Sequence, residues 1–286
     1  MALSCFAMPL RAEVKGFDHS LWDAFLKKYV NENGEVDYRA VQKDPAMLDA
    51  YFDFFSKEKL IEFEAFWPRE EQIAFWLNVY NAAVIKLITQ HYPVSSIQKI
   101  PSVWDITIVR LGRGEQFSLN GIRSEQLMKK YRDEKIHLAL SCGARGCPKL
   151  QRDAFTGKNV EGQLFLATRS FLSDPKNLEI VPGKKNIWLS RIFKWYAADF
   201  NLDFGTPETI GKFTQDEMSV LSFLAYYLER EEQIAFLEEG KYKIKYYSFD
   251  WRLNDWTGNI SSEIRPPEEG AALPQALVPA APDKKS

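Results

Sequence analysis

The residues with the clearest chemical potential lie in the segment 136–148, which reads IHLALSCGARGCP. Its apolar residues alternate with smaller ones, which predicts a core strand over 135–141 and a loop over 142–148. On a regular strand, His137 and Cys142 would lie on opposite faces. The glycines at 143 and 146 permit a reversal that brings Cys147 back toward the imidazole. Because a nucleophilic thiol needs a base within reach, we expect Cys147 to attack and His137 to take its proton.

Other arrangements of the same side chains stay open. In an exported protein, Cys142 and Cys147 would form a disulfide across the tight loop, and in a reducing compartment they would be two buried thiols. A zinc site built from His137 and the two cysteines lacks a CxxC element and a second cysteine pair. We therefore predict no metal ligands, and place Cys142 in the binding pocket.

A second group of polar residues follows one stripe of a long predicted helix. Pro68 at the start and His91 near the end bound this helix, and Glu71, Asn78 and Asn81 recur on one face of it. We expect Glu71 to orient the imidazole and the two amides to shape the pocket. The alternative is that the amides hold neighbouring loops through their backbone groups, since a buried amide must be hydrogen-bonded. In either case we predict that Asn81 is buried and bonded outside its own helix.

The elements around these residues predict an α+β fold, in which helices pack on a small antiparallel or mixed sheet. Amphipathic helices are expected over 17–30, 47–55, 122–131, 160–172, 192–198 and 217–228. A hairpin over 106–119 and strands over 36–38, 178–181, 187–189 and 242–249 complete the pattern. We expect one domain over residues 16–263.

Composition and the two ends of the sequence restrict the class of protein. The formal net charge is −2 and acids and bases are interleaved, so no basic field for nucleic acid is present. No apolar run approaches the roughly 20 residues of a membrane span. A phosphate loop, GxGxxG and GxSxG are lacking, and no cofactor is expected. Residues 1–15 resemble a shortened export signal, which favours the periplasm over the cytoplasm, and residues 264–286 are expected to be a disordered tail.

Several blocks in order also resemble one known family, the domain of unknown function 547 family in its bacterial form. The blocks are 71–82, 92–97, 136–150, 189–200 and 249–254, and the likeness covers most of residues 17–255. The resemblance implies a cysteine-peptidase-like architecture. It would be papain-like or transglutaminase-like with a rearranged order of elements, because His137 precedes Cys147 here.

Two hypotheses about function follow. The first is a thiol hydrolase or transferase that acts on an amide or peptide bond, with Cys147, His137 and Glu71 as its catalytic residues. The second is a non-catalytic binding or scaffold domain for a protein partner, with a structural cysteine pair. A Cys147 sulfur close to a His137 nitrogen in an open cleft would favour the first, and burial of both would favour the second.

Overall fold

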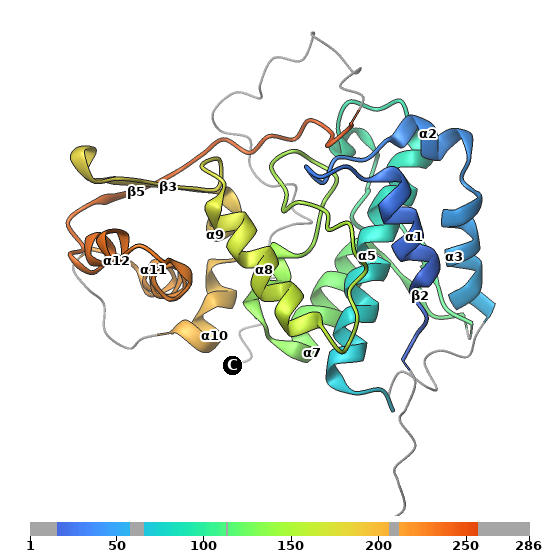
Figure 1. Ribbon diagram of the computed structural model, residues 1–286, viewed down its shortest axis with the longest axis horizontal. Coiled ribbons are helices and arrows are strands. Elements are labelled where there is room, and N and C mark those ends of the chain that lie inside the picture. The colour runs from blue at the N-terminus through green and yellow to red at the C-terminus, as the bar shows by residue number, and fades with distance from the viewer. Residues whose placement is uncertain (1–15, 58–65, 113, 206–211, 257–286) are drawn as a thin grey trace, which may run out of the picture.

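The computed structural model describes residues 16–57, 66–112, 114–205 and 212–256, and helices dominate these segments (Figure 1). The principal α-helices are α1 (Ser20–Tyr29), α2 (Tyr38–Lys43), α3 (Ala46–Lys57), α5 (Arg69–His91), α8 (Val160–Ser173), α9 (Arg191–Trp195), α11 (Gln215–Tyr227) and α12 (Glu231–Glu238). Shorter α-helices are α6 (Leu119–Gly121), α7 (Lys129–Tyr131) and α10 (Asn201–Phe204). A π-helix, η2 (Ile122–Met128), and four 3-10 helices are also present: η1 (Ile97–Lys99), η3 (Glu134–Leu138), η4 (Pro182–Lys184) and η5 (Ala197–Phe200). No helix in the described segments is long and apolar enough to cross a membrane.

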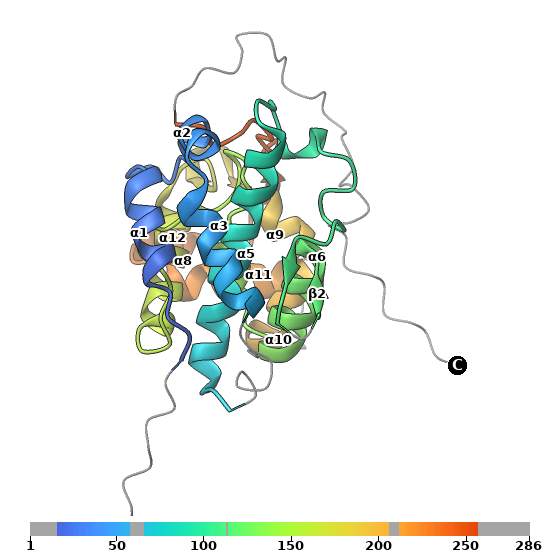
Figure 2. The ribbon, with the colours of Figure 1, turned by 90° about the vertical axis from the view of Figure 1, so that its right-hand side faces the viewer.

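The long helix α5 runs through the middle of the core, as its apolar pattern predicts. Pro68 precedes its first turn, where Glu70 and Glu71 complement the positive end of the helix dipole. Almost every side chain from Ile73 to Thr89 is buried. The helices α2, α8 and η2 pack against it, and Figure 2 shows it enclosed among its neighbours. This burial on several sides makes α5 the support on which the surrounding loops are fixed.

An aromatic cluster joins the N-terminal helices. Trp22 of α1 stacks on Phe25 and on Tyr51 of α3, with ring centroids 5.2 and 5.8 Å apart. The Tyr51 hydroxyl is hydrogen-bonded at 2.7 Å to Nδ1 of His19, just before α1. The cluster thereby buries a histidine in an aromatic environment.

Two small sheets complete the α+β fold. The strands β1 (Val109–Arg110) and β2 (Gln116–Phe117) form an antiparallel hairpin. The strands β3 (Leu178–Val181) and β4 (Asn186–Leu189) pair antiparallel, and β4 pairs parallel with β5 (Lys243–Tyr246). This mixed sheet lies at one end of the molecule, near α11 and α12 (Figure 1). The predicted mixed sheet is therefore confirmed.

After β5 the chain returns across the molecule as an extended segment, residues 249–256, here named the C-terminal strap (Figure 1). Val36 donates its backbone N–H to the Asn254 carbonyl at 2.8 Å and accepts from the Trp256 N–H at 3.0 Å. Gly143 accepts from the Asn254 N–H at 3.1 Å. The strap therefore connects the N-terminal segment to the loop that carries the cysteines.

The main error of the sequence prediction concerns the segment 135–141. It was expected to be a core strand, but it forms the end of η3 and then irregular backbone. Likewise, the expected strand 36–38 is reduced to single bridges at Val36, and α2 begins at Tyr38. The other expected helices and strands are present, with boundaries that differ by a few residues, although the hairpin strands are much shorter than expected. The suggested leader and tail lie outside the described residues.

Candidate functional site

His137 lies in η3, where it is buried and held on two sides. Asp133 begins this helix, and its carboxylate accepts a hydrogen bond from the Lys135 N–H. The Nε2 of His137 donates to Oδ2 of Asp199 at 2.7 Å. The imidazole also stacks on the Tyr196 ring, with centroids 4.0 Å apart and planes 9° from parallel. Both partners come from one short segment, so 196–199 fixes the position and orientation of the imidazole.

The surroundings keep the imidazole of His137 neutral. Burial lowers the pKa of His137, and the nearby Arg123 guanidinium lowers it further, whereas the hydrogen bond and the charge of Asp199 oppose this effect. Arg123 is itself buried and lies over the Tyr196 ring. With its proton on Nε2 and bonded to Asp199, a neutral imidazole presents Nδ1 as an acceptor. His137 therefore has the protonation state of a general base.

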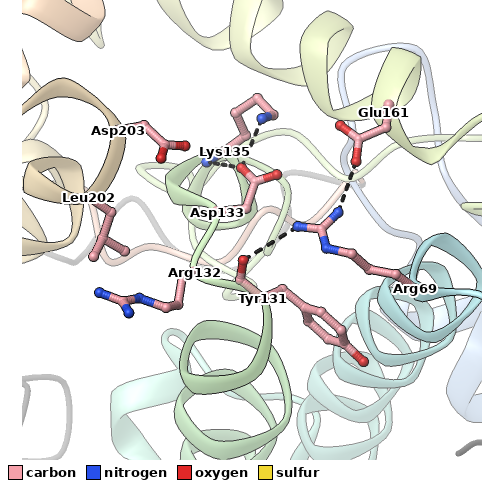
Figure 3. Close-up of a pocket in the computed structure, with 8 residues that line it drawn as sticks. All are labelled: Arg69, Tyr131, Arg132, Asp133, Lys135, Glu161, Leu202 and Asp203. Atoms are coloured by element: carbon pink, nitrogen blue, oxygen red, sulfur yellow. Dashed lines mark hydrogen bonds and ion pairs between the residues drawn. The ribbon is translucent and has the colours of Figure 1, made fainter.

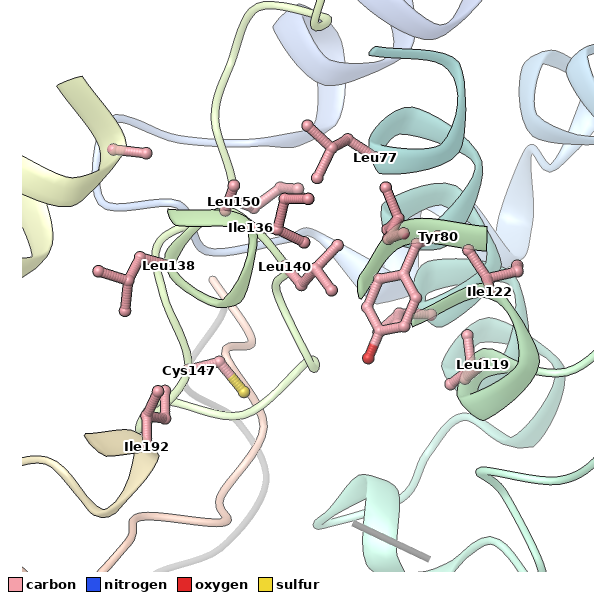
Figure 4. Packing of buried hydrophobic residues seen from close by; sticks show 14 of the residues in the cluster. Leu77, Tyr80, Leu119, Ile122, Ile136, Leu138, Leu140, Cys147, Leu150 and Ile192 are labelled. Atoms are coloured by element: carbon pink, nitrogen blue, oxygen red, sulfur yellow. The ribbon is translucent and has the colours of Figure 1, made fainter. Parts of the chain in front are cut away.

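The two cysteines form a disulfide between Cys142 and Cys147, with their Cα atoms 5.7 Å apart. The loop between them turns at Gly143, whose φ of +75° favours glycine. A Cβ on Gly143 would lie 2.3 Å from Cδ1 of Ile88 in α5, so the loop also packs too closely for any side chain there. Figure 4 shows Cys147 in the hydrophobic core together with Leu138 and Ile192. In this state neither sulfur is a free thiol.

A small cavity of about 30 Å³ brings Cys142 and His137 together. In this disulfide form its volume is enough for one or two water molecules. The wall is mostly aromatic, with Arg123 as its cation. The remaining lining residues are Tyr80, Leu140, Pro148, Ile192, Trp195, Tyr196, Phe249 and Trp251.

A much larger groove of about 760 Å³ lies on the other side of the disulfide. Cys147 lines this groove, whereas Cys142 lines the small cavity. Pro148 and Phe249 contribute to both, so the two spaces are neighbours. The disulfide thus stands between the imidazole cavity and a groove of the size that binds ligands in proteins.

The amides on α5 hold loops through backbone groups. Asn81 donates from Nδ2 to the Ala139 carbonyl at 3.2 Å and accepts from the Ser141 N–H at 2.9 Å. Asn78 makes the same two bonds to the carbonyl and N–H of Phe155, at 2.8 and 2.9 Å. Both amides are buried, and neither lines the described cavities. The prediction that Asn81 is buried and bonded outside its helix is confirmed.

Glu71 is placed differently from the prediction. Its carboxylate lies against two glycines, since a Cβ on Gly157 or Gly16 would meet the Glu71 carboxyl group at 2.3 Å. Asp199 holds the imidazole instead. Asp199 was not among the predicted site residues, and its only signal in the sequence is its place in the block 189–200.

The cysteine assignment also changes. The glycine loop was expected to bring Cys147 back toward His137, yet Cys142 is the cysteine that shares its cavity. The alternation argument failed because η3 and the irregular residues after it do not alternate like a strand. In the structure Cys142, His137 and Asp199 are the residues that lie together, because Cys142 and His137 line one cavity and Asp199 binds the imidazole.

A further cavity of about 570 Å³ lies where α5, α7, η3, α8 and α10 meet, and Figure 3 shows its charged lining. Arg69 pairs with Glu161 at 3.2 Å and Lys135 with Asp133 at 3.0 Å. Its lining includes no histidine or cysteine. Across the described part of the chain, no group of three or more His, Cys, Asp or Glu residues is arranged to hold a metal ion.

Comparison with known proteins agrees with the resemblance seen in the sequence. Residues 65–172 match the model of a family described as protein of unknown function, DUF547. No curated protein and no solved structure matches the chain significantly. The matched segment contains α5, the imidazole and both cysteines. Residues 65–172 are therefore similar to the DUF547 family, as the sequence blocks indicate.

Proposed function

We propose that the protein is a thiol-dependent hydrolase or transferase acting on an amide or peptide bond, and that its disulfide form is a resting state. The nucleophile is Cys142 after reduction, His137 is the general base, and Asp199 orients the imidazole. The observation that carries the proposal is that Cys142 and His137 line one cavity while Asp199 binds the Nε2 of the ring. A cysteine-peptidase-like architecture is part of the same proposal.

The reaction begins with reduction of the disulfide by a dithiol donor, which supplies two electrons and two protons and becomes a disulfide itself. The Cys142 thiol then gives its proton to Nδ1 of His137 as the sulfur attacks the substrate carbonyl. The carbon–nitrogen bond breaks, and the imidazolium returns the proton to the leaving amine. Water or an acceptor amine attacks the resulting thioester and releases the Cys142 thiol.

The electrostatics of the cavity support this division of roles. Since burial and Arg123 lower the pKa of His137, its imidazole is neutral at neutral pH and is ready to accept a proton. Asp199 is partly exposed, with 31% of its side chain accessible, and its carboxylate stabilises the imidazolium that forms.

The test is alkylation of the reduced protein with iodoacetamide across a range of pH, with each cysteine quantified by peptide mapping. We expect Cys142 reactivity to fall only below the ordinary histidine pKa of 6.5, as His137 becomes protonated. In His137→Ala, the inflection should move to about 8.5, the value of an unassisted thiol. His91→Ala is the matched control, because His91 is exposed at the end of α5. Identical pH profiles for Cys142 in the parent and in His137→Ala would refute the proposal.

The second candidate is a non-catalytic binding domain with a structural disulfide. Burial favours it, because only 3% of His137 and 7% of Cys147 are exposed. In that case both thiols of the reduced protein would react only as fast as the protein unfolds. Replacing both cysteines with serine would then lower the free energy of unfolding by about 2 kcal/mol, the value for so short a loop, and leave ligand binding unchanged.

A further inference from the structure

We propose that the groove beside the disulfide binds an acidic peptide segment and that Arg145 is its carboxylate receptor. Calling this peptide the substrate rests on the proposed function, whereas its binding requires no free thiol. The groove has a volume of about 760 Å³, and Arg145 lines it two residues from Cys147. A peptide carboxylate bound there would place the neighbouring peptide bonds next to the disulfide.

Hydrogen bonds to backbone carbonyls hold Arg145 in place, and none of them pairs its guanidinium with a carboxylate. Its N–H donates to the Arg252 carbonyl at 2.8 Å, and the Gly146 N–H donates to the Asp250 carbonyl at 2.9 Å. Its side-chain Nε donates to the Leu253 carbonyl at 3.3 Å. The C-terminal strap therefore holds both the main chain and the side chain of Arg145 in place.

Among the residues that the structure describes, the side chain of Arg145 is bonded only through Nε, and its terminal nitrogens have no hydrogen-bond or ion-pair partner. The Asp250 carboxylate, which lines the same groove, is engaged by Arg252, whose Nε lies 2.9 Å from Oδ1. Burial raises the pKa of the Asp250 carboxyl, but Arg252, and to a smaller extent Arg145, lower it below its ordinary value. Within the described segments Arg145 has no acidic partner of its own. A guanidinium that is fixed and unpaired offers two parallel N–H donors to an incoming carboxylate.

Other charges of the groove agree with an anionic ligand. Lys149, Lys176 and Arg191 line it without an acidic partner among the described residues. The acids of the lining other than Asp250 accept hydrogen bonds from uncharged donors, as Glu179 does from the Tyr247 hydroxyl. The groove is lined by five lysines and arginines and by four acidic residues, so its formal charge is positive, whereas the net charge of the whole chain is −2. The groove is thus more positive than the rest of the protein.

The proposal is tested by fluorescence anisotropy on the full chain with its disulfide intact. The probes are two labelled hexapeptides, one rich in glutamate and one with lysine in place of each glutamate. We expect the acidic peptide to bind at least about tenfold more tightly at low salt, and the difference to shrink as salt screens the charges. Equal binding of the two peptides, or binding of neither, would overturn the proposal.

Variants assign the effect to Arg145. R145E should weaken binding of the acidic peptide by about tenfold or more, and R145K should give an intermediate loss because lysine keeps the charge but not the paired donors. R230E changes the total charge equally at an exposed position outside the groove and should bind like the parent. If R145E binds the acidic peptide as well as R230E does, Arg145 is not the receptor. Because the measurement needs no thiol, a failed alkylation test with successful peptide binding would refute the catalytic function alone.

Discussion

The hydrogen bonds of Asn81 provide the most direct test of how the cysteine loop is positioned. In Asn81→Leu, the buried Ala139 carbonyl and Ser141 N–H both lose their side-chain partner. An unsatisfied buried backbone group costs about 1–3 kcal/mol, so the variant should lose about 2–6 kcal/mol of unfolding free energy. That is a large part of the roughly 5–15 kcal/mol that stabilises a typical domain.

The matched control is Asn78→Leu, because Asn78 makes the same two bonds to Phe155 and is equally buried. Urea unfolding without reductant should show comparable losses for the two variants. A second measurement, the rate at which dithiothreitol reduces the folded protein, should separate them. Only Asn81→Leu loosens the segment that leads to Cys142, so it alone should be reduced faster. A loss below about 0.5 kcal/mol for Asn81→Leu, the size of an ordinary surface substitution, would contradict the reasoning, as would equal acceleration in both variants.

Three further predictions concern the fold. Burial lowers the pKa of His19 from 6.5 to about 3, so the unfolded chain binds a proton first as the pH falls below 6.5. The parent should therefore lose about 2 kcal/mol between pH 7 and pH 5 relative to His19→Gln, as measured by urea unfolding, and equal pH dependence would exclude this role. Gly143→Ala should lower the melting temperature by several degrees, because the new Cβ would clash with Ile88 and because the positive φ of residue 143 is unfavourable for alanine. An unchanged melting temperature would show that the loop can shift. Thr214→Ala removes the capping box of α11 and should cost about 1 kcal/mol in urea unfolding, whereas a change near zero would show that packing alone fixes this helix end.

The parts of the fold that could be predicted from sequence are those with a long or local signal. Helix α5 has 23 residues and an apolar pattern around most of its circumference, so its burial followed directly. The short hairpin at β1 and β2 followed from its glycines. The segment 135–141 could not be assigned in this way, because a short apolar run fits a strand and a buried turn equally well. Asn81 supplies hydrogen bonds to Ala139 and Ser141 that a neighbouring strand would otherwise provide.

The candidate site depended on distances that the sequence does not contain. Glu71 and Asn81 share a stripe of α5, but they are ten residues apart, which is about 15 Å along a helix. Since Asn81 holds the loop near the imidazole, Glu71 lies too far along the axis to reach the same place. Asp199 is 62 residues from His137, and no periodicity links the two positions. The sequence indicated which residues could take part in chemistry, but it did not indicate which residues each of them contacts.

The C-terminal strap also determines when this fold can be completed during synthesis. The Tyr38 hydroxyl donates to Oδ1 of Asn254 at 2.7 Å, across 216 positions of sequence, and the Asn254 amide donates to the Gly34 carbonyl across 220. These two hydrogen bonds cannot form until Asn254 leaves the ribosome. Contacts of such separation slow folding, because a long loop must close before they form. The N-terminal helices therefore lack these contacts until most of the chain has been synthesised.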